Sequence, residues 1–490
     1  MSGARVRIAG AVVSAVAVAA ALALAAPVRA GGPTMTIGVL DDAVKQPTLL
    51  QAAAKMALLR SAGFNTVRVT ETWAVGERTP PVEDILGLEN VVAAARQLGM
   101  RVGIEAFPYG SSQTPLTQTA RAQFATFAAS LARSLGVRDV VVGNEPNLNR
   151  FWMPQFNPDG SDAAAPAFLS LLTQTYDALK AVDPGVAVDG VAVSPQGIDR
   201  PGTGRDTHSP TAFIHDLGVA YRASGRTLPI MDTFDIHVYE DNSSIPPTFA
   251  HPASTTISIA DYGKLVPLLG QAFDGTPQPG STLPIVYGEY GVETTIPPDK
   301  AALYTGTEPA TTKPVDPSKQ GTYYREAIAL AFCQSNVRAL FFFHAFDEPT
   351  HAGWQSGVYY VDETPKPSLT IVRKAISEAH RGIIARCPGL ELTPEALSLV
   401  WPHGRLSAST PVRFRLDCSI DCSYTASLEK VPSGAAVLTT RGRLVGRTPN
   451  QVSLARRVAP GRYRLHLTLA APVNPGPPRV LTSPPFALLA

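Results

Sequence analysis

Two glutamates stand out because each follows a short apolar run and lies in a turn-like segment that contains glycine. Glu145 belongs to Val-Val-Val-Gly-Asn-Glu-Pro-Asn (140–147), and Glu289 belongs to Pro-Ile-Val-Tyr-Gly-Glu-Tyr-Gly (284–291). Such runs are typical of buried parallel strands, so both carboxylates are expected where a strand ends. Two carboxylates can together cleave a glycosidic bond, one by protonating the leaving oxygen and the other by attacking or stabilising the anomeric carbon. This chemistry requires a fold that brings the two side chains together.

The elements that would position these glutamates repeat regularly along the chain. Short runs rich in apolar and β-branched residues are predicted as strands at Met35–Leu40, Thr66–Thr70, Val102–Phe107, Val140–Gly143, Val186–Val193, Thr233–Val238, Ile285–Gly288 and Ala339–His344. Helical periodicity separates them, for example in Val91–Leu98, Ala120–Leu135, Ala167–Val182, Thr211–Ala223, Tyr323–Cys333 and Ser368–His380. The helix after the seventh run is expected to begin late, near Gln320. Eight strand–helix units over residues 31–388 favour a closed (β/α)8 barrel, a TIM barrel, over an open sheet.

The connections between these elements differ in length in a consistent way. Those from helix to strand are short, as at 61–65, 98–101 and 182–185. Those from strand to helix are long and rich in Pro, Gly and aromatic residues, at 146–163, 194–210, 240–256, 290–319 and 345–366. Functional loops of such barrels follow the carboxyl ends of the strands. Both glutamates are therefore expected on the functional face.

The first thirty residues have the features of a targeting segment. Arg5 and Arg7 precede an apolar run from Ala9 to Ala26, and Val28-Arg29-Ala30 has the small–x–small form of a cleavage site. We expect a signal peptide at 1–30, cleaved after Ala30, and hence a secreted chain. A transmembrane anchor is the alternative, but the run has only about 18 apolar residues and no stop-transfer pattern follows it. No later stretch is apolar enough to serve as an anchor.

The last hundred residues differ from the rest in both pattern and charge. Alternating runs such as Val412–Leu416, Tyr424–Leu428 and Tyr463–Leu469 predict a small β-sandwich over 389–490. Residues 391–490 carry a net charge of +7, whereas residues 31–390 carry −8. An acidic barrel argues against nucleic acid as a partner. The basic sandwich could contact an anionic cell envelope, although a charge excess of this kind is more often solvated surface.

The four cysteines suit an oxidising compartment. Cys418 and Cys422 are close enough in sequence to close a small loop, and Cys333 and Cys387 could join two neighbouring helices. None has metal-ligand spacing and no Cys-x-x-Cys motif occurs. We therefore expect no metal and no cofactor.

The chain contains the motifs Gly63-Phe-Asn-Thr-Val-Arg68, Asn144-Glu145-Pro146, His237-Val-Tyr239, Glu289, Trp354-Gln-Ser-Gly357 and Lys366-Pro367. Together they resemble clan A of the glycoside hydrolases, of the family 5 or family 39 type, over residues from about 34 to 380. The resemblance implies that Glu145, on the fourth strand and preceded by Asn144, is the acid/base, and that Glu289, on the seventh, is the nucleophile. It also implies retention of configuration through a covalent glycosyl-enzyme.

Physical reasoning gives the neighbouring residues matching roles. Asn144 can donate a hydrogen bond to the sugar 2-hydroxyl, which strengthens as charge develops in the transition state. Arg68 would keep Glu289 ionised and oriented. Tyr239 could hydrogen-bond the nucleophile, and His237 could bind a substrate hydroxyl.

Each acid also has a simpler interpretation. Glu145 could be the first-turn acid of a helix, where a carboxylate suits the helix dipole. Glu289 could be a solvated turn residue, with Glu293 as its main rival for the role of nucleophile. Asp347 and Glu348 are further candidate acids, for which loop structure or substrate contact is favoured.

Aromatic residues in the long loops point to a saccharide, because sugar rings stack their C–H faces on such side chains. They are Trp73, Tyr109, Phe151, Trp152, Tyr290 and Trp354. Packing of the loops themselves is the alternative. The eighth strand of the clan commonly ends in Trp, but here the chain reads Phe-Phe-Phe-His-Ala-Phe (341–346). His344 or Phe346 would then replace that platform, or Trp354 would supply it.

The sequence thus predicts a secreted, retaining glycoside hydrolase that acts on a carbohydrate. One alternative is a transglycosylase with the same site. The other is a non-catalytic carbohydrate-binding or cell-envelope protein on a barrel scaffold, for which the full set of Arg68, Asn144, Glu145, Tyr239 and Glu289 would be unnecessary.

Overall fold

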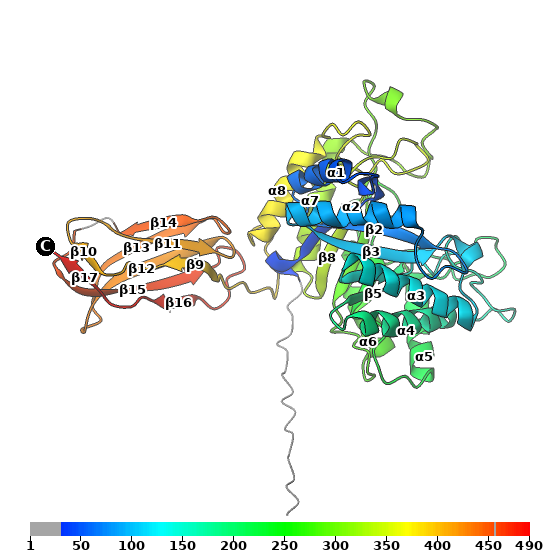
Figure 1. The fold of residues 1–490 in the computed structure, drawn as a ribbon, viewed down its shortest axis with the longest axis horizontal. Helices are drawn as coiled ribbons and strands as arrows, with labels where there is room; N and C mark the ends of the chain where they lie inside the picture. Colours follow the sequence, from blue (N-terminus) through cyan, green and yellow to red (C-terminus); the bar gives the residue numbers. More distant parts are fainter. Residues whose placement is uncertain (1–30, 455–456) are drawn as a thin grey trace, which may run out of the picture.

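The chain folds into a TIM barrel followed by a β-sandwich, as predicted (Figure 1). The computed structural model describes residues 31–454 and 457–490, so the predicted signal peptide at 1–30 lies outside the described residues. The barrel strands pair in the order of the sequence, all parallel, and the eighth pairs with the first. They are β1 (Thr36–Leu40), β2 (Thr66–Trp73), β3 (Arg101–Pro108), β4 (Asp139–Val142), β5 (Ala187–Val193), β6 (Thr233–His237), β7 (Ile285–Tyr290) and β8 (Val337–Phe343).

A helix follows each strand and covers the outside of the barrel (Figure 1). These helices are α1 (Leu49–Ala62), α2 (Val82–Leu98), α3 (Gln118–Leu135), α4 (Ala164–Val182), α5 (Pro210–Ala223), α6 (Tyr262–Phe273), α7 (Pro317–Cys333) and α8 (Ser368–His380). α2 begins well before the predicted Val91. The prediction missed its first turns because they are largely exposed and lack a regular apolar stripe. α7 begins close to the predicted Gln320.

The inside of the barrel is ionic at its centre. Alternate side chains of a barrel strand point inward, and here several of them are charged. Arg68 on β2 is completely buried and forms ion pairs with Asp235 on β6 at 2.7 Å and with Asp189 on β5 at 3.1 Å. Its guanidinium also lies over the ring of Phe341, 4.2 Å from the ring centre. This charged layer of Arg68, Asp189 and Asp235 lies beneath the carboxyl ends of the strands. The two glutamates were expected at those carboxyl ends.

The carboxy-terminal unit consists of two sheets around a separate apolar core. One sheet has the order β10-β17-β15-β12-β13, with β16 paired to β15, and the other has the order β14-β11-β9. The strands are β9 (Ala396–Val400), β10 (Arg405–Ser407), β11 (Val412–Cys418), β12 (Cys422–Lys430), β13 (Ala436–Leu444), β14 (Asn450–Leu454), β15 (Gly461–Ala470), β16 (Arg479–Thr482) and β17 (Phe486–Leu489). Disulfides join Cys333 to Cys387 and Cys418 to Cys422, the two pairings that the sequence allowed.

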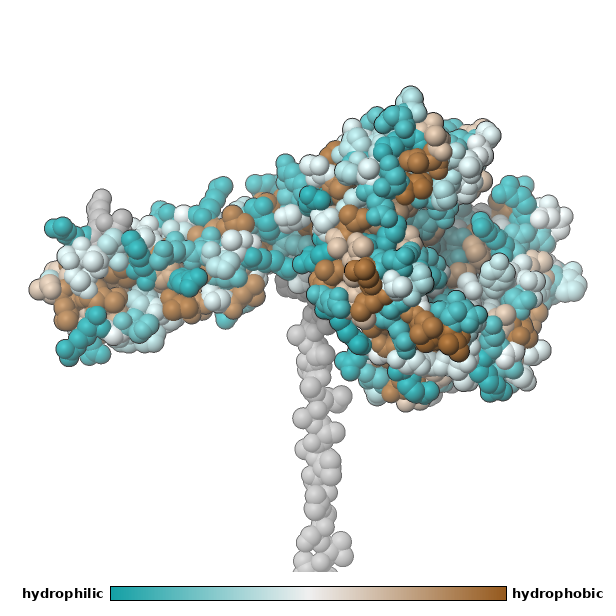
Figure 2. All heavy atoms as spheres, turned by 45° about the horizontal axis from the view of Figure 1, so that its top comes forward, coloured by the Kyte–Doolittle hydropathy of each residue, from teal (hydrophilic) through white to brown (hydrophobic). Residues whose placement is uncertain are grey.

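Barrel and sandwich share a hydrophobic contact where they meet. Leu392, Ile420 and Ala471 belong to the apolar cluster of the barrel rather than to that of the sandwich. Arg381, just after α8, pairs with both carboxylate oxygens of Asp421 at 2.8 and 2.7 Å. The sandwich projects from the barrel, and the visible face is mainly hydrophilic with small scattered apolar patches (Figure 2). Within the two described ranges, no helix is both long and apolar enough to cross a membrane.

Candidate active site

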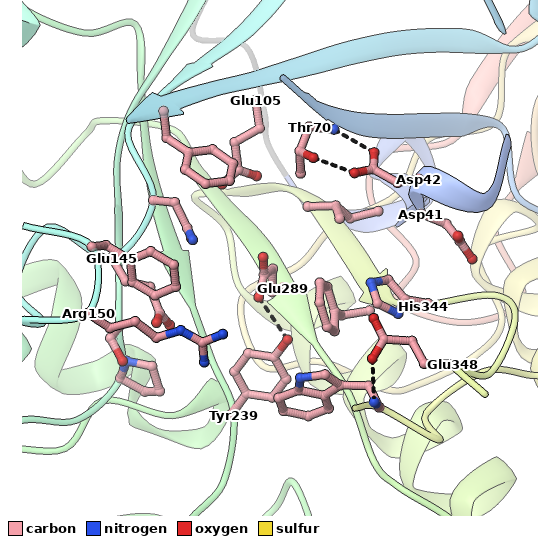
Figure 3. Close-up of a pocket in the computed structure, with 18 of the residues that line it drawn as sticks. Asp41, Asp42, Thr70, Glu105, Glu145, Arg150, Tyr239, Glu289, His344 and Glu348 are labelled. Carbon is pink, nitrogen blue, oxygen red and sulfur yellow. Dashed lines mark hydrogen bonds between the residues drawn. The ribbon is translucent and has the colours of Figure 1, made fainter. Parts of the chain in front are cut away.

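A cavity of about 600 Å³ opens at the carboxyl ends of the barrel strands. Its lining residues include Asn144, Glu145, Tyr239, Glu289 and Trp354, which were singled out from the sequence. Figure 3 shows Glu289 near the middle of this cavity, with Glu145 on one side and Tyr239 below it. The barrel topology therefore brings together side chains from β7 and from the segments that follow β4, β6 and β8.

The turn that carries Glu145 has an unusual backbone. Gly143 has φ +94°, and a Cβ at this position would lie 2.7 Å from the ring of Phe168. Glu145 itself has φ +43°, in the left-handed region that non-glycine residues rarely occupy. Its N–H donates to the carbonyl of Ala192 at 2.8 Å, and Ala192 also has positive φ. Left-handed residues of this kind cost on the order of 1–3 kcal/mol each and cluster at functional sites.

Glu289, on β7, is held by His237 at the end of β6 and by Tyr239 just after it. The hydroxyl of Tyr239 donates a hydrogen bond of 2.8 Å to Oε2 of Glu289, and Nδ1 of His237 lies 3.3 Å from the same oxygen. Burial raises the pKa of Glu289, and the adjacent Glu145 adds to this effect. The charge of His237 and the hydrogen bond from Tyr239 act in the opposite direction and favour the carboxylate.

His237 joins the two glutamates. Its Nδ1 lies 3.0 Å from Oε1 of Glu145 as well as 3.3 Å from Oε2 of Glu289. Because one nitrogen contacts both, these two carboxylate oxygens are at most 6.3 Å apart. Burial opposes protonation of the imidazole, but Glu289, Glu145 and Glu105 outweigh it and raise the pKa of His237 to about 10. The side chain is fully buried, and its Nδ1 faces the two carboxylates.

Glu105 on β3 is a component of the site that the sequence analysis missed. It lines the cavity, its residue is only 1% exposed, and neither carboxyl oxygen has a hydrogen-bond partner in the described part of the chain. One oxygen of Glu105, one ring nitrogen of His237 and one oxygen of Glu289 lie within 4.8 Å of one another. The signal that could have revealed it is a lone acid inside the apolar run 102–107.

Arg68 differs from its expected role. Its ion-pair partners among the described residues are Asp189 and Asp235, in the layer below the cavity, rather than Glu289. The Coulomb attraction of Asp235 and Asp189 outweighs the effect of burial and raises its pKa, so Arg68 stays charged. The prediction that Arg68 contacts the nucleophile is therefore wrong. The reason is that two inward-facing aspartates on β5 and β6 lie closer to it.

Three of the predicted aromatic contacts are core residues. Trp73 is fully buried, packs edge-on against Phe124 at 5.6 Å and donates its N–H to the carbonyl of Glu77. Trp152 is 1% exposed and packs against Phe168 at 5.4 Å. Tyr290 is fully buried against Tyr324 and Phe342. The expectation that these three stack on a sugar is wrong, because long loops need an apolar core of their own.

Trp354 and His344 do line the cavity. The Trp354 ring lies 4.9 Å from that of Tyr239, tilted by 34°, and 5.3 Å from that of Phe343. His344 is 9% exposed at the end of β8. The Trp354 indole is partly exposed and packs next to Tyr239, the residue that hydrogen-bonds Glu289.

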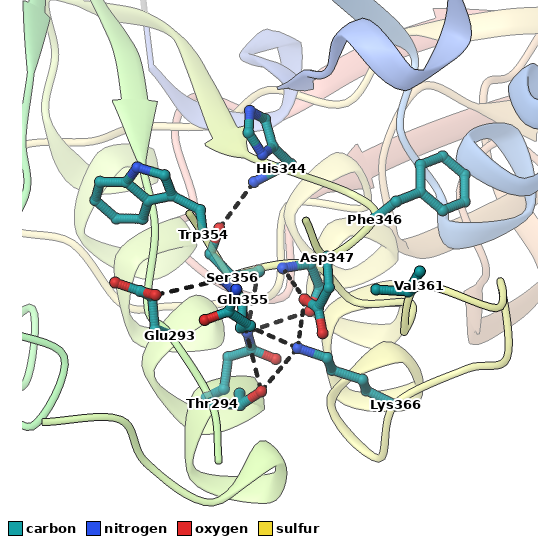
Figure 4. Close-up of polar contacts among 12 residues, drawn as sticks. Glu293, Thr294, His344, Phe346, Asp347, Trp354, Gln355, Ser356, Val361 and Lys366 are labelled. Atoms are coloured by element: carbon teal, nitrogen blue, oxygen red, sulfur yellow. Dashed lines mark hydrogen bonds and ion pairs between the residues drawn. The ribbon is translucent and has the colours of Figure 1, made fainter. Parts of the chain in front are cut away.

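A buried polar network fixes the loop that carries Trp354 (Figure 4). Lys366 donates to Asp347 at 2.7 Å and to the carbonyl of Gln355 at 2.8 Å, with both charged side chains fully buried. The N–H of Gln355 donates to Glu293 at 3.3 Å. Glu293, the rival nucleophile, supports this loop and is not among the described residues that line the main cavity. Glu348 has a similar role, since it accepts from the N–H of Trp354 at 2.9 Å.

Carboxyl groups dominate the lining of the cavity. The acids are Asp41, Asp42, Glu105, Glu145, Glu240, Asp241, Glu289, Asp347 and Glu348, whereas the basic side chains among its described lining residues are Arg150 and His344. Such a lining disfavours anionic ligands. It leaves uncharged and cationic ligands as candidates.

Comparison with known proteins supports the fold. No family model and no curated sequence matches the chain. A family 39 glycoside hydrolase from the gut symbiont Bacteroides cellulosilyticus is similar in structure, with a TM-score of 0.52 and 16% identity over 86% of this chain and 82% of that one. GH5_18 from Streptomyces cattleya has a TM-score of 0.48 and 15% identity, over 78% and 85%. A glucosidase from Croceicoccus marinus also has a TM-score of 0.48, with 12% identity over 87% and 95%. At 16% identity, the likeness to the family 39 structure shows that the two chains share a fold.

Proposed function

We propose that the protein is a retaining glycoside hydrolase with Glu145 as acid/base and Glu289 as nucleophile. The observation that carries this proposal is the single imidazole of His237 between the two carboxylates. It limits the separation of these two oxygens to 6.3 Å or less, which accommodates the ~5–5.5 Å between the carboxyl groups of retaining enzymes. The likeness to glycoside hydrolase structures agrees with this assignment.

The reaction would proceed in two displacements. Glu145 gives its proton to the leaving glycosidic oxygen while Glu289 attacks the anomeric carbon, which forms a glycosyl ester on Glu289. Glu145, now a carboxylate, takes a proton from water, and that water attacks the anomeric carbon and releases Glu289. Tyr239 and His237 stabilise the carboxylate of Glu289 between turnovers.

Asn144 and Trp354 are assigned to substrate binding. The side-chain oxygen of Asn144 is buried and has no partner among the described residues, and the residue lines the cavity beside Glu145. Its amide would hydrogen-bond the sugar hydroxyl next to the anomeric carbon, and the indole of Trp354 would stack on a sugar face. The acidic lining favours neutral or cationic sugars over uronic acids.

A panel of aryl glycosides and plant and bacterial polysaccharides tests the proposal, with Glu145→Gln and Glu289→Gln as controls. We expect turnover with retained anomeric configuration by NMR, and a loss of at least about 1,000-fold in kcat for each variant. Azide should restore turnover of activated substrates by Glu289→Ala, with inverted product. Full activity of either Gln variant would disprove the site. Products formed with added sugar acceptors distinguish hydrolysis from transglycosylation.

Secretion is part of the same proposal. It is supported by the targeting features of residues 1–30 and by the two disulfides. The N-terminal sequence of the protein recovered from culture medium tests cleavage after Ala30. Contact of the cationic sandwich with an anionic cell envelope is a secondary proposal, which co-sedimentation with envelopes at low and high salt tests.

A further inference from the structure

Glu105 has no role in the two displacements described above, although it lies next to Glu289 and His237. It is on β3, opposite Thr70 of β2 and Val141 of β4, with its side chain inside the barrel. Figure 3 shows it on the opposite side of Glu289 from Tyr239. One of its oxygens is within 4.8 Å of a Glu289 oxygen and of a His237 ring nitrogen.

We propose that Glu105 is a positioning residue for the nucleophile: as a neutral carboxylic acid, it donates a hydrogen bond to Glu289 in the working enzyme. The inference rests on the glycosidase function proposed above. In this chain Glu105 supplies the support for Glu289 that Arg68 was expected to give.

The charges around Glu105 favour its neutral form. The cations that face it are His237 on β6 and Arg68 on β2, and the anions are Glu289 on β7 and Asp235 on β6. Arg68 is already paired with Asp235 and Asp189, and His237 with the two catalytic glutamates. Neither cation is therefore left to balance an ionised Glu105.

The hydrogen bonds lead to the same conclusion. A buried carboxylate is stabilised when it accepts hydrogen bonds, but neither oxygen of Glu105 accepts one from any described residue. Burial, reinforced by the charge of Glu289, raises the pKa of Glu105 well above its ordinary value. A protonated carboxyl carries one O–H, and that hydrogen needs an acceptor.

Glu289 is the acceptor that the geometry offers. Its Oε2 already receives the Tyr239 hydroxyl, which leaves Oε1 for a second donor. Catalytic hydrogen bonds are often long without substrate and shorten in the complex, so the separation of up to 4.8 Å between the two carboxyl groups would close when substrate binds. A short O–H···O⁻ bond would lower the pKa of Glu289 and fix the oxygen that attacks.

Two variants separate this role from simple packing. Glu105→Gln is uncharged, has the same shape and keeps an N–H donor, whereas Glu105→Ala removes the donor. We expect Glu105→Gln to keep kcat within about fivefold of wild type, and Glu105→Ala to lower kcat by about 10- to 100-fold with little change in KM. Tyr239→Phe removes the other donor to Glu289 and serves as the positive control.

The pH profile of kcat/KM shows whether the pKa of Glu289 rises or falls in each variant, because its acid limb reports the ionisation of the free nucleophile. Loss of a donor raises the pKa of Glu289, so Glu105→Ala should move the acid limb up by about one pH unit while Glu105→Gln leaves it in place. If Glu105 is instead ionised, both variants remove a negative charge and the limb moves down. That result, or a wild-type profile for Glu105→Ala, would overturn the proposal.

A measurement without turnover keeps this test independent of the proposed function. The infrared difference spectrum of wild type minus Glu105→Gln near pH 7 should contain the C=O band of a protonated carboxyl group. A carboxylate band in its place refutes the neutral form, even if Glu105→Ala does not fold. Lack of turnover by the wild-type protein would disprove the glycosidase assignment, while the infrared band would still report the proton on Glu105.

Discussion

Replacement of His237 by Gln removes the positive charge between the catalytic glutamates, and its effect can be worked out from the structure. Between its ordinary value of 6.5 and about 10, the raised pKa of His237 corresponds to about 5 kcal/mol of interaction with the surrounding carboxylates. Without the imidazolium, Glu289 loses its nearest positive charge and its pKa rises further. We expect kcat/KM to fall by about 100- to 1,000-fold and the acid limb of its pH profile to move upward.

The same change has a signature in stability. Since the folded pKa is raised, the stabilisation by this proton is complete below pH 6.5 and is lost as the pH rises through about 10. The difference in unfolding free energy between wild type and His237→Gln should shrink by up to about 5 kcal/mol over that range. Denaturant titrations at about pH 6, 8 and 10 measure it. A difference that stays constant or grows with pH would refute the assignment of an imidazolium.

Three further predictions concern the surroundings of the site. Lys366→Met leaves Asp347 buried without its partner, so it should lower the free energy of unfolding by about 3–5 kcal/mol in denaturant titrations. It should also raise KM, because the loop that carries Trp354 becomes less ordered. The double variant with Asp347→Asn should recover part of the lost stability. Trp354→Ala should raise KM by about tenfold or more with a smaller effect on kcat, and an unchanged KM would exclude a stacking role. Removal of the Cys333–Cys387 disulfide, which spans 54 positions, should lower stability by about 4 kcal/mol; calorimetry of the double Ser variant measures it, and an unchanged melting temperature would contradict it.

The fold could be predicted because each strand, turn and helix start has a signal in its own short stretch of sequence. Each buried parallel strand reads as an apolar run, and the turns and helix starts divide the chain into repeating units. The placement of Glu145 and Glu289 follows from topology, since the carboxyl ends of all barrel strands meet on one face. Their contact through His237 adds a detail that strand counting does not contain.

The ionic partners inside the barrel could not be assigned from sequence. Arg68 has several inward-facing acids within reach, and strand stagger decides which of them it meets. Asp189 and Asp235 each interrupt an apolar strand, as Glu105 does, so an isolated acid in such a run signals a side chain inside the barrel. Aromatic residues in long loops gave no comparable signal, because core packing and sugar stacking select the same side chains.

The contact between barrel and sandwich affects how cooperatively the chain unfolds. Ile420 and Ala471 complete the apolar cluster of the barrel, and the two hydrogen bonds from Arg381 to Asp421 tie α8 to the sandwich. Heating should therefore produce a single calorimetric transition, although the architecture has two parts. Excision of residues 389–490 would uncover apolar surface at the base of α8, and the truncated barrel should self-associate. The sandwich thus covers apolar surface of the barrel that would otherwise be exposed to water.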